Sequence, residues 1–258
     1  MQLTKNIIKK IKSLDSKKHR ESEQIFVAEG SKNVLDFIKS GMIPTHLCAY
    51  PDWILENNEI LKGNEDKIFE IGETEMKKIS FLNTPSPVLA TFPINNANEI
   101  DYSTNEKMLI LFLDGIQDPG NLGTLLRTAD WFGIKNIICS NSTVDCYNPK
   151  VVQASMGSLA RVNIQYTNST TFFENLPKKT PVLGAHMEGK SITNFKFPQK
   201  AILVIGNEGK GISPETSIYI SEKISIPKPL LNQEKNSLES LNASIAGAII
   251  CYEFSKQT

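Results

Sequence analysis

Apolar and polar positions follow two periods along this chain, and their alternation predicts an α/β protein. Near the N-terminus Leu3, Ile7, Ile11 and Leu14 recur at steps of four, four and three residues, the spacing of one helix face. From residue 25 to 94, short apolar runs alternate with helical patterns. The expected strands there are 25–30, 45–50, 67–71 and 88–94, and the expected helices include 31–39 and 73–80.

The alternation is stronger after residue 107, where MLILFLDG at 108–115 is typical of a buried parallel strand. A helix is expected next, from about Asn121 to Phe132, and Gly133 ends it. The other expected strands are 136–140, 161–166, 181–187, 201–206 and 223–227, and the other expected helices are 149–155, 170–176 and 240–254. Strands that alternate with helices predict a mostly parallel sheet with helices on both faces.

The polar segment NNANEIDYSTNEK at 95–107 has no apolar periodicity and is predicted to be a linker. We therefore expect a smaller α/β domain over residues 1–97, a linker over 98–107 and a larger domain over 108–258. The length of 258 residues agrees with this division, because one domain commonly has about 100 to 200 residues.

The charges exclude a uniformly basic nucleic-acid coat, because 28 basic residues balance 28 acidic ones. A local basic patch is present all the same, since residues 1–20 hold seven Lys or Arg residues and one acid, Asp15. A solvated surface helix explains such a face. The alternative is a helix that contacts phosphates, because lysines neutralise phosphates and release counterions.

Four cysteines and three histidines without CxxC spacing form no recognisable zinc-ligand cluster. The cysteines are expected to be reduced and mostly buried. No apolar stretch reaches the roughly 20 residues of a membrane span, and Met1 to Leu14 lacks the continuous apolar core of a signal peptide. We therefore expect a cytoplasmic protein without a metal.

Three glycine-rich or polar turns each follow an expected strand, at the strand ends where α/β sheets bind ligands. They are DGIQDPGNLGTLLRTAD at 114–130, GNEGKGIS at 206–213 and SLNASIAGA at 240–248. The first lacks the GxGxxG fingerprint, and in the second no Ser or Thr follows Lys210, as a P-loop requires. A nucleotide-binding oxidoreductase and a Walker-type ATPase are both disfavoured.

Together the turns resemble, in the right order, the three signatures of the SpoU/TrmH family of RNA ribose 2′-O-methyltransferases. DPGNLGTLLRTADWFG is similar to the first, GNEGKGIS to the second, and Ile226-Pro227 followed by SLNASIAGAI to the third. The resemblance covers roughly residues 108–254. The segment FVAEGSKNVLDFIKSG at 26–41 is similar to the substrate-binding domain of ribosomal-RNA members.

This resemblance implies a C-terminal trefoil knot, an L30e-like first domain, and S-adenosylmethionine (AdoMet) as the methyl donor. It also implies a homodimer with the site near the subunit interface. Ribosomal RNA is the favoured substrate because of the N-terminal domain. Transfer RNA is the alternative substrate, and an RNA-binding protein that has lost its activity is the alternative class.

By the same resemblance Arg127 is the central catalytic residue, together with Asn121, Glu208, Ser240 and Asn242. A protonated guanidinium cannot act as a base, so we expect Arg127 to grip the phosphate beside the target ribose and to stabilise the developing alkoxide.

Each of these residues also has an ordinary structural explanation. Arg127 could pair with Asp130 on the helix surface. Asn121, Ser240 and Asn242 could cap helices, and Glu208 could be a solvent-facing turn carboxylate. The intact set argues against a retired enzyme.

For AdoMet the resemblance implies Gly206, Ile226 and Leu241, whose backbone groups hold the adenine while apolar side chains cover its ring. Two places depart from the family. KPLLNQEKNSLE at 228–239 is longer than the usual connection and lacks its glycine, which leaves the shape of the cofactor loop open. Gln153 stands where relatives often carry arginine, so an RNA contact would be weaker or the target different.

Overall fold

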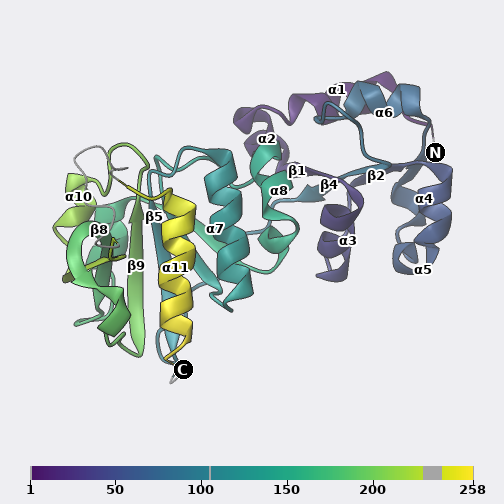
Figure 1. The fold of residues 1–258 in the computed structure, drawn as a ribbon. Helices are drawn as coiled ribbons and strands as arrows, with labels where there is room; N and C mark the ends of the chain where they lie inside the picture. Colours follow the sequence, from purple (N-terminus) through teal and green to yellow (C-terminus); the bar gives the residue numbers. More distant parts are fainter. Residues whose placement is uncertain (1, 105, 229–239, 258) are drawn as a thin grey trace. The chain divides into compact units, whose positions relative to one another are not determined.

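The computed structural model describes residues 2–104, 106–228 and 240–257 (Figure 1). Contacts between residues divide the chain into two compact units, which are described separately below. The first unit comprises residues 1–96 and 145–161, and the second comprises 97–144 and 162–258. The first unit therefore includes a segment that lies well inside the second half of the sequence.

The first unit is built on a mixed sheet with strand order β1-β4-β2-β3. Both β1 and β2 run antiparallel to β4, and β3 is parallel to β2. The strands are β1 (Ile25–Glu29), β2 (His46–Ala49), β3 (Ile68–Glu70) and β4 (Val88–Pro93). The helices are α1 (Lys5–Ser13), α2 (Lys17–Glu23), α3 (Ser31–Lys39), α4 (Pro51–Glu56), α5 (Asn58–Leu61), α6 (Glu73–Ile79) and α8 (Pro149–Ser155), with short 3-10 turns at Glu65–Lys67 and Ser158–Ala160.

The basic N-terminal segment forms two helices, where the apolar spacing predicted one. Ile11 and Leu14 are fully buried, so the apolar stripe packs into the core as expected. The basic residue Arg20 does not belong to an exposed face, because it is only 2% exposed. Its Nε and Nη2 donate to Asp145 Oδ2 at 2.9 and 2.6 Å, and its Nη1 donates to the carbonyl oxygen of Leu14 at 2.6 Å. Arg20 is thus a core residue that no phosphate could reach.

The segment 145–161 is held within the first unit by aromatic, polar and steric contacts. The ring of Tyr147 lies 4.8 Å from that of Phe26, and Gln153 Oε1 accepts a hydrogen bond from Asn33 Nδ2 at 3.2 Å. Gly157 has a φ of +84°, and a Cβ there would stand 2.3 Å from a carboxylate oxygen of Asp36. Only glycine allows this close approach at that backbone conformation.

Replacing Asp145 with Ala should destabilise the protein strongly, because the buried guanidinium of Arg20 would lose its counter-charge. We expect the free energy of unfolding in urea to fall by about 3 kcal/mol. The control is Asp66→Ala, which removes an exposed carboxylate that pairs with Lys67, and it should cost under about 1 kcal/mol. Equal effects of the two variants would contradict the role given to Asp145.

The second unit is built on a parallel sheet with strand order β10-β8-β9-β5-β6-β7. Its strands are β5 (Met108–Asp114), β6 (Asn136–Ser140), β7 (Asn163–Thr167), β8 (Val182–Ser191), β9 (Lys200–Gly206) and β10 (Glu222–Ser225). Its helices are α7 (Pro119–Trp131), α9 (Ser169–Glu174), α10 (Pro214–Ser217) and α11 (Ala243–Ser255), with a 3-10 turn at Ile192–Asn194. The prediction of an α/β fold with a mostly parallel sheet is confirmed.

Helices cover both faces of this sheet because side chains alternate along each strand. Phe112 of β5 contacts Phe173 of α9, with ring centroids 4.7 Å apart. On the opposite face α11 packs against α7 and β9, and the two helices lie side by side in Figure 1. A Cβ on Gly247 of α11 would come within 2.6 Å of Leu125 and 2.8 Å of Ile205, so a glycine is needed for this packing.

All four cysteines are free and buried, as the sequence analysis expected. Burial raises the pKa of the Cys48, Cys139 and Cys251 thiols to about 12, so these groups are protonated at neutral pH. Among the described residues, no helix is both long and apolar enough to cross a membrane.

Candidate active site

The first and second turns are joined directly beyond the carboxyl ends of β5 and β9. Asp114 and Gly206, the last residues of these strands, are partners in the sheet register. The residues that directly follow these two strand ends are also joined, because Asn207 Nδ2 donates a hydrogen bond to the carbonyl oxygen of Gly115 at 2.7 Å. The buried Asp114 also accepts a hydrogen bond from the Ser213 amide at 2.8 Å.

The second turn folds back on the end of β9, and this explains the glycine at 206. Asn207 and Gly211 form an isolated bridge, while Asn207 Oδ1 accepts the amides of Gly209 and Lys210 at 3.0 Å. A Cβ on Gly206 would stand 2.4 Å from the backbone of Gly211 and Ile212. This compact turn leaves Glu208 exposed at its tip.

A chain of side-chain hydrogen bonds brings all three turns together. Asn121 Nδ2, from the first turn, donates to Glu208 Oε1 of the second at 2.7 Å. Asn121 Oδ1 accepts Asn242 Nδ2 of the third at 2.9 Å, and Ser244 Oγ lies 3.3 Å from the same oxygen. Residues up to 123 positions apart in the sequence thus form one polar cluster. We call Asn121, Glu208, Asn242 and Ser244 the amide cluster.

The local helix ends explain why these amides can reach each other. Asp118 caps α7 by accepting the Asn121 amide at 2.8 Å, so the alternative explanation of Asn121 as a helix cap is wrong and its side chain can join the cluster. Asn242 does cap α11, with Oδ1 accepting the amides of Ser244 and Ile245 at 2.9 and 3.3 Å. Capping fixes this oxygen and therefore directs the Asn242 Nδ2 group outward to Asn121.

Two residues expected at the site lie outside this hydrogen-bonded set. Arg127 is exposed, and in the part of the chain that the structure describes its side chain makes no hydrogen bond or ion pair, including with Asp130. Along α7, six residues separate it from Asn121, so it points about 120° away around the helix axis. Ser240 is exposed and lies two residues before the cap of α11. Among the described residues, no hydrogen bond joins it to the amide cluster.

The residues expected at the cofactor follow the strand ends on the same side of the sheet. Gly206 ends β9, and Ile226 comes directly after β10; both are half-buried. Leu241 precedes α11 and is 51% exposed among the described residues, so part of its apolar surface is accessible. The expected cofactor loop at 228–239 lies, except for Lys228, outside the described residues.

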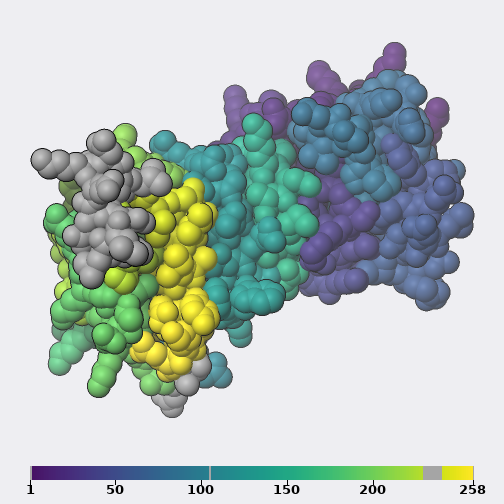
Figure 2. All heavy atoms as spheres, viewed as in Figure 1, coloured from purple at the N-terminus to yellow at the C-terminus, as the bar shows by residue number. Residues whose placement is uncertain are grey.

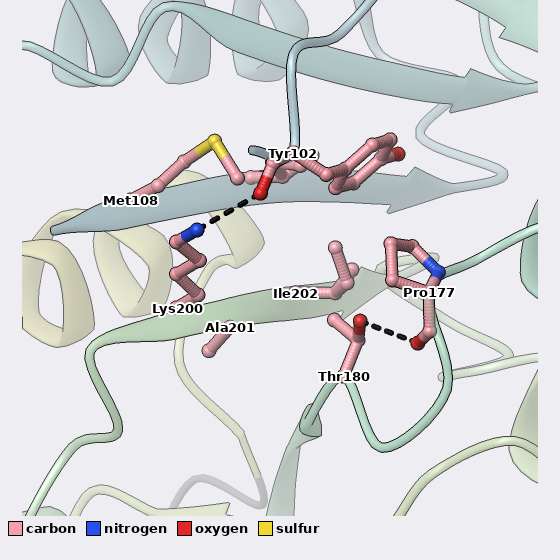
Figure 3. Close-up of a pocket in the computed structure, with 8 residues that line it drawn as sticks. Tyr102, Met108, Pro177, Thr180, Lys200, Ala201 and Ile202 are labelled. Atoms are coloured by element: carbon pink, nitrogen blue, oxygen red, sulfur yellow. Dashed lines mark hydrogen bonds between the residues drawn. The ribbon is translucent and has the colours of Figure 1, made fainter. Parts of the chain in front are cut away.

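A cavity of about 190 Å³ lies at the opposite end of the strands (Figure 3). It is lined by Met108 and Lys200, the first residues of β5 and β9, and by Tyr102 and Thr180 among others. Its polar groups are already engaged, since Lys200 Nζ donates to the carbonyl oxygen of Tyr102 at 2.9 Å and Thr180 Oγ1 donates to that of Pro177 at 2.7 Å. The cavity is therefore separate from the amide cluster.

Sequence reasoning missed two residues of the site, Asn207 and Ser244. Asn207 stands at the start of GNEGKGIS, and an asparagine two residues before a glycine is a turn-forming signal. Ser244 comes two residues after the capping Asn242, where a hydroxyl can meet the cap oxygen. Each of these two patterns involves only residues that are neighbours in the sequence. The connection to Asn121 arises only from tertiary structure.

Comparison with known proteins identifies the class that this fold and site define. Residues 108–252 match the SpoU rRNA Methylase family, and residues 5–90 match the MRM3-like substrate binding domain. The chain belongs to the SpoU rRNA Methylase family. The resemblance expected from the three turns is thereby confirmed.

Individual relatives extend over the whole chain. A 23S rRNA (guanosine(2553)-2'-O)-methyltransferase, RlmP of Bacillus subtilis (strain 168), is 27% identical over an alignment 256 residues long that covers 95% of this chain and 94% of RlmP. A TrmH-family protein from Porphyromonas gingivalis is 36% identical, with a TM-score of 0.84 and 100% of both chains covered. An rRNA methyltransferase from Sinorhizobium meliloti, solved with AdoMet bound, is 28% identical with a TM-score of 0.85, over 99% of this chain and 96% of its own.

Proposed function

We propose that this protein methylates the 2′-hydroxyl of a ribose in structured RNA, and that its substrate is ribosomal RNA. The observation that carries the proposal is the amide cluster, because it unites all three signature turns at the ligand-binding edge of the sheet. The name of the RlmP relative, which specifies 23S rRNA and a 2′-O position, supports the substrate and the atom. The match of residues 5–90 to a substrate-binding domain supports an RNA that needs a second contact surface.

AdoMet is the methyl donor of this enzyme, and when bound it supplies an electrophilic methyl group on a sulfonium. The AdoMet-bound relative from Sinorhizobium meliloti supports this assignment. Backbone groups of Gly206 and Ile226 would hold the adenine, and Leu241 would cover its ring. The exposed apolar surface of Leu241 is the feature of this chain that fits such a ring.

The catalytic groups act by placing the ribose and stabilising charge. Asn121 uses one amide hydrogen for Glu208 and keeps the other for the substrate. Glu208 Oε1 accepts from Asn121, and its other oxygen is an acceptor for a ribose hydroxyl. Ser240, exposed before α11, would donate to or accept from the RNA backbone. Arg127 would grip the phosphate and stabilise the alkoxide as the proton leaves.

We propose that Arg127 serves the site of a second copy of this chain, which its position apart from the amide cluster supports. Arg127 lies between Thr124 and Trp131 on an exposed stripe of α7, and Trp131 is 84% exposed. On the neighbouring α11, Ile245 and Tyr252 are each 52% exposed, and in Figure 2 the yellow spheres of α11 lie at the surface. The exposed side chains of Trp131, Ile245 and Tyr252 support the proposal of a homodimer through α7 and α11. Arg127 would then complete the partner's amide cluster.

We also propose how the two domains are built and where they are bounded. We propose that the C-terminal segment forms a trefoil knot, and that the first domain is L30e-like and reads RNA. In this proposal residues 1–97 are the RNA-binding domain, residues 98–107 are the linker and residues 108–258 are the catalytic domain. Residues 145–161 pack with the first domain. A cytoplasmic location fits buried, reduced cysteines.

One experiment tests the proposed reaction. The purified protein is incubated with AdoMet and unmodified ribosomal RNA or transfer RNA pools, and modified nucleotides are mapped by mass spectrometry. Ribose methylation in ribosomal RNA is expected, and methylation of a base would overturn the reaction. Methylation confined to transfer RNA would overturn the substrate. A calorimetric titration with no heat of AdoMet binding would favour a retired RNA-binding protein.

Two lysines of α1 are expected to contact RNA phosphates. Lys5 and Lys9 are exposed on one helix face and make no ion pair within the described residues, whereas Lys10 pairs with Glu23 at 2.7 Å. The double variant Lys5→Ala, Lys9→Ala should reduce the slope of log affinity against log salt by about 2, one unit for each phosphate contact. The control Lys62→Ala should leave the slope unchanged. An unchanged slope in the double variant would remove α1 from the RNA surface.

A further inference from the structure

We propose that Ser244, to which no role has been assigned, is a positioning residue for methyl transfer. Its hydroxyl would lock the side-chain amides of Asn121 and Asn242, so that the free amide hydrogen of Asn121 faces the substrate in one fixed direction. The inference rests on the proposed function, since it names a further residue of that site.

Ser244 is the point where the two amides of the cluster meet. Its Oγ lies 2.6 Å from Asn242 Oδ1 and 3.3 Å from Asn121 Oδ1, and the residue is only 5% exposed. The shorter distance assigns the hydroxyl hydrogen to Asn242, with Asn121 Oδ1 as a second acceptor within reach. The buried hydroxyl thus touches both amides from one position on α11.

The remaining contacts of the cluster show what this hydroxyl adds. Glu208 holds the nitrogen of the Asn121 amide at 2.7 Å, and Asn242 holds its oxygen at 2.9 Å. Both contacts come from exposed turn residues, whereas Ser244 is in the first turn of a packed helix. Asn242 is tied to the same helix through its cap, and the buried Ser244 hydroxyl adds a second connection between Asn121 and α11. A site placed on rigid elements holds its geometry more closely than one placed on loops.

Removing this hydroxyl should leave the fold intact. Asn242 Oδ1 would still accept the amides of Ser244 and Ile245, so α11 would keep its cap. Alanine is also the residue most favourable to helix. The effect of Ser244→Ala should accordingly fall on the positions of the two amides.

The first measurement is turnover with AdoMet and RNA. Ser244→Ala should reduce kcat about tenfold, as a small misplacement of a catalytic group does, with AdoMet affinity unchanged. In the Asn121→Ala background the same substitution should change kcat by less than about twofold, because two residues that act through one group are not additive. The control is Ser155→Ala, which removes a buried hydroxyl whose one hydrogen bond within the described residues goes to the Val152 carbonyl. It should leave kcat unchanged.

The second measurement needs neither substrate nor activity. The side-chain amide signals of Asn121 and Asn242 are followed by ¹H–¹⁵N NMR in the ligand-free protein, assigned from the Asn121→Ala and Asn242→Ala variants. Both signals should shift in Ser244→Ala and stay in place in Ser155→Ala. Ser244→Cys, which keeps the volume and a weak donor, should give intermediate shifts and turnover.

The outcomes separate this inference from the proposed function. Unmoved amide signals, or a tenfold loss that persists in the Asn121→Ala background, would overturn the role of Ser244 while leaving the enzyme a ribose methyltransferase. Shifted amide signals in a wild-type protein that methylates no ribose would keep the positioning role and overturn the reaction. If Ser244→Ala fails to fold, Ser244→Cys decides, and wild-type amide signals and turnover in that variant would overturn the proposal.

Discussion

Turnover of the Arg127→Lys variant should fall about 100-fold, the loss seen when a group that stabilises transition-state charge is removed. Lysine keeps the positive charge but loses the planar fork that binds a phosphate through two hydrogen bonds. AdoMet affinity should stay nearly unchanged, because Arg127 lies apart from Gly206, Ile226 and Leu241. Turnover and a calorimetric titration measure the two effects. The control is Arg161→Lys, the same chemical change at a surface ion pair with Asp36.

For the proposed homodimer, a mixed dimer tests where Arg127 acts. The variants Arg127→Ala and Asn121→Ala are co-expressed with different tags, and the mixed dimer is isolated by two successive affinity steps. If Arg127 serves the partner's site, one site of the mixed dimer is intact and the other lacks both groups. The mixed dimer should then have about half of wild-type activity, while each parent dimer is nearly inactive. A mixed dimer as inactive as its parents would place both residues in the same chain's site.

Replacing Asn121 with Asp should abolish most activity at neutral pH. The amide nitrogen that donates to Glu208 at 2.7 Å would become a carboxylate oxygen, and two negative groups would face each other. We expect turnover to fall about 100-fold at pH 8, as for other misplaced catalytic groups. Like-charged carboxylates at this distance share a proton as the pH falls, so the loss should become smaller toward pH 5.

The pH profile distinguishes this explanation from simple unfolding. A variant damaged in its fold would lose activity at every pH, and its melting temperature would fall relative to wild type. Recovery toward acid, at an unchanged melting temperature, would support repulsion between residue 121 and Glu208. Asn168→Asp provides a matched control, because Asn168 Oδ1 caps α9 (Ser169–Glu174) by accepting the Thr171 amide at 3.3 Å and a carboxylate oxygen can take the same role.

The expected strands and helices agree closely with those observed, because periodicity records which side of each element is buried. The run at 108–115 became the central strand β5, and the helices expected at 31–39 and 149–155 have the same bounds in the structure. The N-terminal helix was predicted less well. Its apolar spacing continued through Leu14, although the chain turns there and buries Arg20 against Asp145. A long-range ion pair leaves no periodic trace in the sequence.

The turns that form the site could be predicted from the sequence, but the arrangement of their side chains could be predicted only in part. Motif order indicated that Asn121, Glu208 and Asn242 belong together, and the structure brings them within hydrogen-bonding distance. The spacing along the expected helix already turns Arg127 about 120° from Asn121, but sequence position could not show which other turns face each of these two residues. Nor could it show that residues 145–161 pack with the first unit, since this packing depends on Gly157 and Asn33 meeting partners more than 100 residues away.

The packing of residues 145–161 with the first unit limits how the two units could be separated. The backbone passes between them at three places, after residues 96, 144 and 161. A fragment that starts at residue 108 would expose the buried side chains of Val151 and Val152. A fragment that ends at residue 97 would lack α8, a helix of the first unit. Neither unit can therefore be isolated as one continuous fragment without losing part of its packing.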